Sequence, residues 1–527
     1  MKKETRLKHK KDYGARLLVV GLLVLLEVAL IISFFVLLIY SQLDGVAYIT
    51  STIVLYLLNI ILSLFIISTK AQVDFKISWL IVVNLVPIAG PLFYFIFANK
   101  ITTRSKKKNR FLKIDSHKKS YYKECSAELD LVKEADYNYY RIFNYINKES
   151  KYSLYTNTLL SYYKVGEEGF PHMLEELKKA KKFIFIEFFI VESGEMFNPI
   201  FDILAQKVKE GVDVRFIYDD FGSVRTVGSN FYKLLRNVGI KSFAFNRIRP
   251  SADIRQNSRD HRKILVIDGV CGFTGGINLA DEYINKKVRF GHWKDNVVML
   301  KGEGVEGLTR IFLSNWTLAS NAPKEDILPF LYRSNIEYLC EYCQNKSFVL
   351  PFGDVPFDNH DIGRNAYLMM IQKAKDSITI STPYLIPDTE LLTALKIASA
   401  SGVRVKIITP GIPDKKIIYQ CTRSYYAELL AAGIEIYEYT PGFNHTKLMV
   451  IDDELAITGT INFDFRAFYL NFENAILVYN DPIIKKMSAD LEGMIEKSTK
   501  QIKEKYLNAP IYKRIYRSIL KVLAPLF

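Results

Sequence analysis

The chain has 527 residues, of which 49% are hydrophobic and 24% are charged, so it is not an intrinsically disordered protein and is long enough for several domains. Its 71 Lys and Arg residues against 56 Asp and Glu give a net charge of +15, which indicates an anionic partner, either nucleic acid or an anionic membrane surface. Five cysteines at irregular spacing exclude a disulfide scaffold and fit a reducing compartment.

Three long apolar runs near the N-terminus decide between these partners. Residues 17–40 contain a single charge, Glu27, and residues 46–68 and 77–98 contain none. About 20 apolar residues suffice to cross a bilayer, and the first run is too long for the apolar part of a signal peptide. A nuclease needs no such anchor, so we expect a multi-pass membrane region over residues 17–98 and no nucleic-acid partner.

The charges beside the apolar runs predict their orientation. The N-terminal tail, residues 1–16, carries seven basic side chains, and the linker after the third run, residues 99–124, carries ten. Basic flanks resist translocation, so both segments are expected in the cytoplasm. The third run is interrupted between Pro87 and Pro91, where two prolines and a glycine break helical hydrogen bonding. We favour a hairpin that enters and returns on the cytoplasmic side; the alternative is a kinked full span with the rest of the chain outside.

From residue 125 onward the composition is that of a soluble α/β protein, and the sequence repeats itself at offsets near 190. Each repeated segment resembles a helix end or a glycine turn followed by a β-prone run. The matching pairs are 177–187 with 371–381, 211–218 with 402–409, and 234–240 with 429–434. Strands that alternate with helices predict parallel-sheet α/β units, and two copies predict a bilobal body with a pseudo-twofold axis. We expect the lobes at residues 125–345 and 346–527.

Candidate catalytic residues recur once in each copy, within residues 255–282 and 439–466. Five residue types return at a constant offset of 184, which makes coincidence very improbable. They are His261, Lys263, Asp268, Gly275 and Asn278 in the first copy, and His445, Lys447, Asp452, Gly459 and Asn462 in the second.

The spacing of these residues indicates phosphoryl chemistry. Side chains alternate along a strand, so each His shares a face with the Lys two residues later. If the copies pack about a twofold axis, two imidazoles and two ammonium groups converge. A neutral imidazole can attack phosphorus, and a protonated one can give its proton to the leaving oxygen. The lysines balance the phosphate charge, so the site is expected to need no metal or other cofactor.

The remaining motif residues have a supporting role in this interpretation. Asn278, Asn462 and Thr460 can donate hydrogen bonds to phosphate oxygens, and Gly275 and Gly459 let the backbone come close. The alternation of side chains along the strand places Asp268 and Asp452 on the face opposite to the His and Lys residues, at the end of the strand. For these two carboxylates a structural turn is at least as good an interpretation as catalysis.

The duplicated pattern resembles the phospholipase D superfamily, whose signature is a repeated HxKxxxxD motif followed by Gly-Ser-x-Asn, and within it the bacterial cardiolipin synthases. One departure is Gly276, which replaces the usual hydroxyl residue of the first copy. The resemblance implies an α/β protein with an N-terminal helical membrane anchor and a bilobal pseudo-twofold body, in which each lobe is a mixed sheet flanked by helices. Further similar segments are 218–223, 293–295, 312–316, 382–388 and 462–466.

The resemblance also implies a reaction. The family joins two phosphatidylglycerol molecules into cardiolipin and releases glycerol through a covalent phosphohistidine, at the bacterial cell membrane. It places an acidic residue beyond each motif to hold the His ring, for which Asp295 and Glu473 are the candidates and Glu187 a weaker one. The alternatives are a phospholipase D, a phosphatidylserine synthase, a nuclease, or an inactive membrane scaffold. The partners expected are phosphatidylglycerol, cardiolipin and an anionic membrane surface.

The C-terminal segment has the pattern of a basic amphipathic helix. Ile511, Ile515, Ile519 and Val522 share one face, and the basic side chains lie off it. Two interpretations are equally good: a helix at the membrane surface, or ordinary docking on the core.

Overall fold

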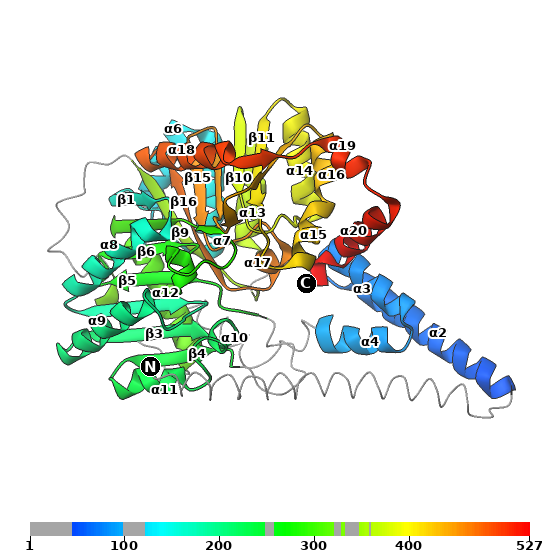
Figure 1. The fold of residues 1–527 in the computed structure, drawn as a ribbon, viewed down its shortest axis with the longest axis horizontal. Coiled ribbons are helices and arrows are strands. Elements are labelled where there is room, and N and C mark those ends of the chain that lie inside the picture. The colour runs from blue at the N-terminus through cyan, green and yellow to red at the C-terminus, as the bar shows by residue number, and fades with distance from the viewer. Residues whose placement is uncertain are drawn as a thin grey trace.

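The computed structural model describes residues 45–98, 122–247, 258–320, 328–331, 347–357 and 360–526. The basic tail, the first apolar run and nearly all of the basic linker lie outside these ranges, so the predictions made for them stay predictions. Figure 1 shows an α/β body of two lobes, from which the long helix α2 projects. This architecture agrees with the fold class expected from the sequence.

Helix α2 (Gly45–Ser68) holds the second apolar run. Among the described residues it alone is long and apolar enough to cross a membrane, over Ile49–Ser68, and only 17% of that span is buried against the rest of the chain. The third run is not one continuous helix: α3 (Val73–Leu85) is followed by α4 (Ala89–Phe93) and by the π-helix η1 (Tyr94–Ala98). The described residues therefore do not support the multi-pass expectation.

The interruption of the third run lies where the prolines predict it. After Leu85 the chain turns, and α4 packs back onto the end of α3 so closely that a Cβ on Gly90 would lie 2.4 Å from the carbonyl oxygen of Val82. Asn59 of α2 donates a hydrogen bond of 2.9 Å to the carbonyl of Pro87, which accounts for a buried amide in an apolar helix. How this bent segment lies relative to a bilayer stays a prediction.

The first lobe is built on a seven-stranded sheet of order β1-β8-β6-β5-β2-β3-β4. Strands β2, β3 and β4 are parallel, whereas β5 is antiparallel to β2 and the strands beyond it are antiparallel too, so the sheet is mixed rather than purely parallel. The strands are β1 (Thr158–Tyr163), β2 (Phe183–Phe188), β3 (Asp213–Asp219), β4 (Lys241–Phe245), β5 (Lys263–Ile267), β6 (Cys271–Gly275) and β8 (Val297–Gly302). The helices of this part are α6 (Ser126–Ala135), α7 (Tyr137–Ser150), α8 (Gly166–Lys179), α9 (Phe197–Lys209), α10 (Asp220–Ser223), α11 (Phe231–Asn237) and α12 (Val305–Ser320).

The second lobe repeats this order in β9-β16-β15-β14-β10-β11-β12 and adds β17 at its edge. The strands are β9 (Phe348–Asp354), β10 (Ser377–Ser381), β11 (Arg404–Pro410), β12 (Glu435–Tyr439), β14 (Leu448–Ile451), β15 (Leu455–Gly459), β16 (Glu473–Tyr479) and β17 (Ser498–Lys500). Its helices are α13 (Ile362–Lys373), α14 (Thr389–Ala400), α15 (Lys416–Ser424), α16 (Tyr426–Ala431), α17 (Phe465–Tyr469), α18 (Pro482–Glu496), α19 (Lys503–Leu507) and α20 (Ile511–Leu523). The duplication predicted from the sequence is therefore a duplication of the whole sheet.

Backbone pairing joins the two lobes at their motifs. Strand β13 (Gly442–Asn444), which leads to His445, pairs in parallel with β7 (His292–Lys294) of the first lobe. In the symmetric place, Asp260 forms a parallel bridge with Phe472 of the second lobe. The segment that enters each motif is thus hydrogen-bonded to the other lobe, which brings both motifs to one interface.

Asp268 and Asp452 lie at the far ends of their strands from the histidines. The carboxylate of Asp268 accepts hydrogen bonds from the backbone N–H groups of Lys181, Lys182 and Phe183 at 2.7–2.8 Å. Asp452 holds the N–H groups of residues 375–377 in the same way, and both aspartates adopt a left-handed backbone, with φ of 53° and 54°. We therefore assign these two motif residues a structural role, in place of the catalytic one.

Substituting Asp268→Ala should leave three backbone donors without their acceptor at the entrance to β2. We expect the free energy of unfolding to fall by about 1–3 kcal/mol, measured by denaturant titration, with turnover per folded molecule preserved. Asp202→Ala, at an exposed position of α9, is the matched control and should change neither. A folded Asp268→Ala protein of normal stability but without turnover would return Asp268 to the catalytic machinery.

Candidate active site

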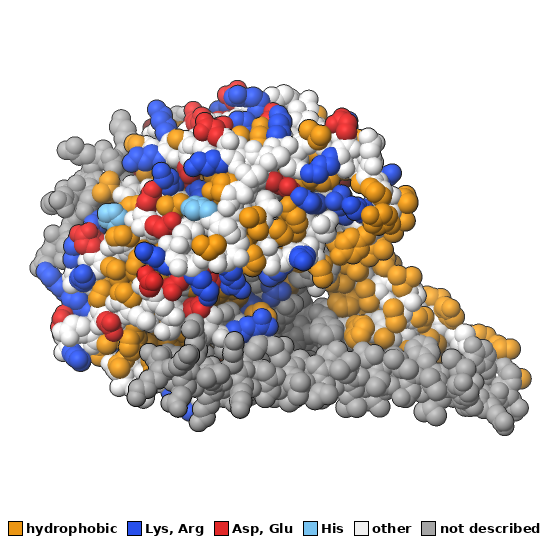
Figure 2. Space-filling model, in the orientation of Figure 1, with side chains coloured by type: hydrophobic (Ala, Val, Ile, Leu, Met, Phe, Trp, Pro, Cys, Tyr) orange, Lys and Arg blue, Asp and Glu red, His pale blue; other side chains and the backbone are white. Residues whose placement is uncertain are grey.

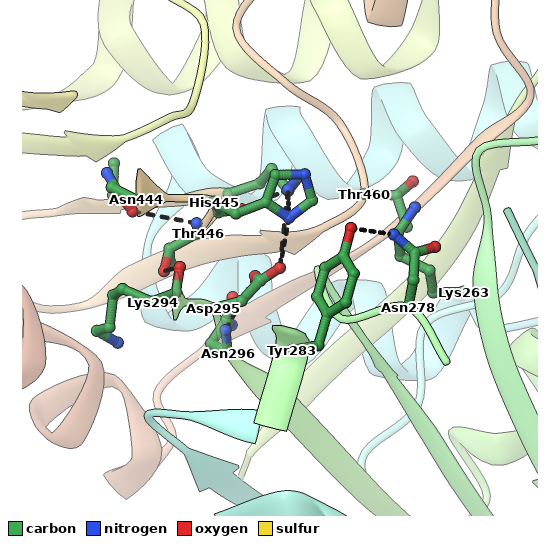
Figure 3. A network of polar contacts seen from close by, with 12 residues as sticks. Lys263, Asn278, Tyr283, Lys294, Asp295, Asn296, Asn444, His445, Thr446 and Thr460 are labelled. Atoms are coloured by element: carbon green, nitrogen blue, oxygen red, sulfur yellow. Dashed lines mark hydrogen bonds and ion pairs between the residues drawn. The ribbon is translucent and has the colours of Figure 1, made fainter. Parts of the chain in front are cut away.

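The two histidines of the motifs lie at the interface between the lobes, and each is held by a carboxylate from the opposite lobe. His261 Nδ1 lies 2.9 Å from both carboxylate oxygens of Glu473, the first residue of β16. His445 Nδ1 lies 2.5 Å from Oδ2 of Asp295, between β7 and β8 (Figure 3). A carboxylate on Nδ1 sets the ring orientation and leaves Nε2 for the reacting atom. The two acids expected from the family pattern thus do contact the histidines, each across the lobe boundary.

The two acids are positioned differently. The hydroxyl of Thr460 donates a hydrogen bond to Glu473, and Asn471 donates a second at 3.1 Å. The first-lobe counterpart of Thr460 is Gly276, where a Cβ would lie 1.9 Å from Oδ1 of Asp295. Asp295 therefore occupies the space of the missing side chain. The hydroxyl of Thr460, which the sequence analysis expects to donate to phosphate, donates to Glu473 in this structure.

The lysines of the motifs lie beside the histidines and are buried with them. Lys263 Nζ donates to the backbone carbonyl of His261 at 2.6 Å, and Lys447 Nζ lies 2.7 Å from Nδ1 of His445. Burial and the facing Lys447 lower the pKa of Lys263 to about 7, and burial lowers the pKa of Lys447 to about 8. Two ammonium groups at close quarters, with little water, make a strong site for a phosphate anion.

Burial also keeps both imidazoles neutral at pH 7. It lowers the pKa of His261 to about 4, against the attraction of Glu473, and lowers the pKa of His445 well below its ordinary value, with Lys447 adding to the effect. Conversely, burial raises the pKa of the Asp295 carboxyl to about 7. The Asp295 carboxyl is therefore partly protonated near neutral pH, beside a His445 ring that burial keeps neutral.

The two asparagines expected to bind phosphate differ in their hydrogen bonds within the protein. Asn278 donates to the hydroxyl of Tyr283 at 2.6 Å and accepts from the backbone of Ile190, whereas Oδ1 of buried Asn462 has no hydrogen-bond partner among the described residues. Gly275 and Gly459 allow two backbone segments of the protein to come close together. A Cβ on Gly275 would lie 2.3 Å from the carbonyl oxygen of Asn296, and a Cβ on Gly459 would lie 2.3 Å from that of Asn474. The two glycines have φ of 148° and 155°.

Aromatic side chains line the histidines, and of these only Trp293 lies in a segment that the sequence analysis named, residues 293–295. The rings of Tyr283 and Trp293 each lie 5.6 Å from that of His445, and Phe189 lies 5.2 Å from His261. Figure 3 shows Tyr283 standing between His445 and Asn278. The position of Tyr283 five residues after Asn278 was the only available signal, and the second copy has Ala467 there.

Comparisons with known proteins agree with this geometry. The model of a family described as the cardiolipin synthase, phospholipase D-like domain matches residues 173–316 and 367–495, and a model of the phospholipase D-nuclease N-terminal region matches residues 57–99. The major cardiolipin synthase ClsA of Bacillus subtilis is 33% identical over 89% of this chain and 98% of its own length. The chain belongs to the cardiolipin synthase family of the phospholipase D superfamily.

Other relatives are consistent with membership in the cardiolipin synthase family. A cardiolipin synthase of Alkalihalophilus pseudofirmus is 34% identical over 85% of this chain and 88% of its own length. An uncharacterized protein of Streptococcus mutans is 38% identical over 88% of this chain and 99% of its own. Among solved structures, phosphatidylserine synthase of Haemophilus influenzae covers 74% of this chain and 98% of its own, with a TM-score of 0.55 and 16% identity, which shows the shared fold.

A buried ionisable cluster behind His261 has no counterpart in the second lobe of this cardiolipin synthase family member. Asn315 donates to Glu187 at 2.7 Å and to Asp260 at 2.9 Å, and Arg262 lies 3.7 Å from Glu187 and donates to the carbonyl of Glu473. Glu187, the weaker candidate from the sequence, therefore does not contact an imidazole. The corresponding second-lobe residues, Ser381 and Asn444, form a neutral pair.

Within the described ranges, no group of three or more His, Cys, Asp and Glu side chains is placed to hold a metal ion. Lys263 and Lys447 bring positive charge to the site.

Substituting Gly276→Ala tests the arrangement around Asp295. The added methyl group needs the space of the Asp295 carboxylate and should displace it from His445, lowering turnover by about 10²-fold, measured as glycerol release from phosphatidylglycerol. Thr460→Ser is the matched control, since it keeps the hydroxyl that holds Glu473 and should stay close to wild type. Equal turnover of Gly276→Ala and wild type would contradict a positioning role for Asp295.

Proposed function

We propose that this chain joins two phosphatidylglycerol molecules into cardiolipin and glycerol, through a phosphatidyl group held covalently on a histidine. As a member of the cardiolipin synthase family it is a phosphatidyltransferase. The observation that carries the mechanism is the pair of crossed contacts, His261 with Glu473 and His445 with Asp295. Two histidines, each oriented through Nδ1, match the two displacement steps that a covalent intermediate requires.

We assign the nucleophile to His261 and the first proton donor to His445. Glu473 accepts a hydrogen bond from Nδ1–H of His261. Nε2 of His261 therefore carries the lone pair that attacks phosphorus. The raised pKa of Asp295 keeps a proton on that carboxyl. When the bond from phosphorus to the glycerol oxygen breaks, Nε2–H of His445 protonates that oxygen and the Asp295 proton moves to Nδ1.

The second step reverses these roles. The terminal hydroxyl of a second phosphatidylglycerol attacks the phosphatidyl-histidine, and its proton passes to Nε2 of His445. Nδ1 returns its proton to Asp295, the phosphorus–nitrogen bond to His261 breaks, and cardiolipin leaves. Lys263 and Lys447 hold the phosphate throughout, because their ammonium groups are buried at the same interface. Atoms and charges balance over the two steps.

The location of the enzyme completes the proposal. The apolar helix α2 supports attachment to the membrane, where both substrates reside. The basic segments on either side of the membrane region favour a catalytic body that faces the cytoplasm, on the positive-inside rule.

Each histidine should be indispensable. We expect His261→Ala and His445→Ala to lower cardiolipin formation from pure phosphatidylglycerol by at least on the order of 10³-fold, with cardiolipin and glycerol appearing in equal amounts in the wild type. His172→Ala, at a half-exposed histidine on α8, is the control and should keep full activity. Release of glycerol with phosphatidic acid instead of cardiolipin would identify a phospholipase D. Formation of phosphatidylserine when serine is added would identify a phosphatidylserine synthase.

An activated leaving group should separate the two histidines. In a p-nitrophenyl phosphodiester of a lipid, the leaving group is p-nitrophenolate, which departs as an anion and needs no proton. His445→Ala should therefore still form the covalent adduct, whereas His261→Ala should not. The adduct is isolated by rapid quench and mapped by mass spectrometry. An adduct on His445 in the wild type would reverse the assignment.

The pH dependence should report the buried groups. As pH falls towards about 4, His261 is protonated and loses its lone pair; as pH rises past about 7–8, Asp295, Lys263 and Lys447 lose their protons. We therefore expect kcat/KM to fall on both sides. Bound phosphate stabilises the protonated groups, so the alkaline limb of kcat should lie at higher pH than that of kcat/KM. Coincident alkaline limbs would contradict titration of groups that face the phosphate.

A further inference from the structure

The C-terminal helix α20 leaves an apolar stripe uncovered. Ile511, Ile515 and Ile519 are 67%, 54% and 52% exposed, and the other exposed large hydrophobic side chains of this helix are Tyr512, Tyr516 and Val522. They lie at helical spacing along one side. A contiguous apolar stripe on one helix indicates an interaction surface, whereas single exposed hydrophobic side chains are common on any protein.

The opposite side of α20 fixes the helix on the second lobe. Leu520 is buried there, and its carbonyl accepts a hydrogen bond from Sγ of Cys421 on α15. Lys521 forms an ion pair of 2.6 Å with Glu428, and the guanidinium of Arg517 lies 5.4 Å from the ring of Tyr506. Docking on the core, one of the two interpretations left open by the sequence, therefore uses Leu520 and the basic side chains rather than the isoleucine face.

The C-terminal segment is also joined to the N-terminal helices. Ser78 of α3 donates a hydrogen bond of 2.6 Å to the carbonyl of Val522, and Leu526 packs against the cluster that contains Trp79 and Val83. Figure 1 shows α20 beside α3, where α2 leaves the body, and Figure 2 shows hydrophobic surface continuing from this corner onto α2. The exposed stripe is thus continuous with the one described helix that can cross a bilayer.

We propose that α20 lies in the interfacial layer of an anionic bilayer, as a second membrane attachment of the catalytic body. Its isoleucine face would enter the boundary between headgroups and acyl chains, and the exposed Lys513 and Arg514 would meet lipid phosphates. The choice of lipid over a protein partner rests on the continuity with α2 and on basic side chains flanking an apolar stripe.

A second attachment has a mechanical consequence for the lobes. A catalytic body attached to the membrane by α2 alone can rotate about the axis of that helix. Attachment through both α2 and α20 restricts this rotation and sets the orientation of the body relative to the membrane surface. Helix α15 packs against α20 and follows a loop that ends in Lys415, one of the charges acting on His445. Its second residue, Ile417, is exposed. Docking of α20 therefore holds this side of the second lobe towards the lipid.

Depth measurement with a spin label tests the proposal without any need for turnover. The full chain, with its five cysteines replaced by alanine, carries a label at Ile515→Cys in vesicles of phosphatidylglycerol and phosphatidylcholine. We expect the label to collide more with oxygen than with a water-soluble nickel chelate, at a depth of about 5–10 Å. The matched control is Ile397→Cys, an exposed isoleucine of α14, which should report water. A label at Ile515 that reports water, or spin–spin broadening from a second copy, would overturn the proposal.

Hydrogen exchange of the unmodified chain provides a measurement that does not depend on the cysteine replacements. Amides of α20 should exchange more slowly in nanodiscs that contain phosphatidylglycerol than in purely phosphatidylcholine nanodiscs, with those of α14 unchanged. Equal exchange of α20 in both lipids would contradict recognition of an anionic surface. Because neither measurement uses catalysis, a failure here is distinct from a failure of the proposed reaction.

Discussion

Each histidine of the two motifs contacts a carboxylate that belongs to the other half of the chain. His261 is held by Glu473, 212 residues later, and His445 by Asp295, 150 residues earlier. Neither lobe therefore contains both members of a histidine–carboxylate pair. The pairing of β7 with β13 adjoins Asp295 and His445, and the bridge between Asp260 and Phe472 adjoins His261 and Glu473. Two further pairs of side chains form hydrogen bonds between the lobes: Asn296 donates to Thr458 at 2.9 Å, and Asn474 donates to Thr274 at 2.8 Å.

Burial of this interface explains its electrostatics. Removing the two imidazoles, the two lysines and Asp295 from water costs free energy unless charges are paired or neutralised. The protein combines both solutions: the imidazoles stay neutral, Asp295 retains a proton, and the lysines lie close to carboxylates and backbone carbonyls. The same burial strengthens the attraction between the lysines and an incoming phosphate anion. Burial of the lysine charges is therefore unfavourable in the empty site and becomes favourable when a phosphodiester is bound.

The pseudo-twofold repeat is not a repeat of identical roles. The sheets have the same strand order, but Glu473 is longer than Asp295 and is held by Thr460, where the first lobe has Gly276. Behind the first motif lies a buried cluster of Glu187, Asp260 and Arg262, and behind the second lie neutral residues. A two-step displacement needs a nucleophile and a proton donor, so divergence of the two halves fits a division of labour between the histidines.

The sequence by itself determined the duplicated α/β body, the apolar helix and the identity of both His–Lys pairs, because strand periodicity and a constant offset of 184 are local properties that can be read along the chain. It also indicated the two acids and the break at Pro87. Only the tertiary structure decided which acid holds which histidine, and that the Thr460 hydroxyl donates to Glu473. It also showed that Asp268 and Asp452 accept hydrogen bonds from the backbone just before β2 and β10. It likewise decided that α20 docks through Leu520 and leaves its isoleucines exposed. These outcomes depend on contacts between residues far apart in the chain, and such contacts are set by how the two lobes pack rather than by any spacing within one of them.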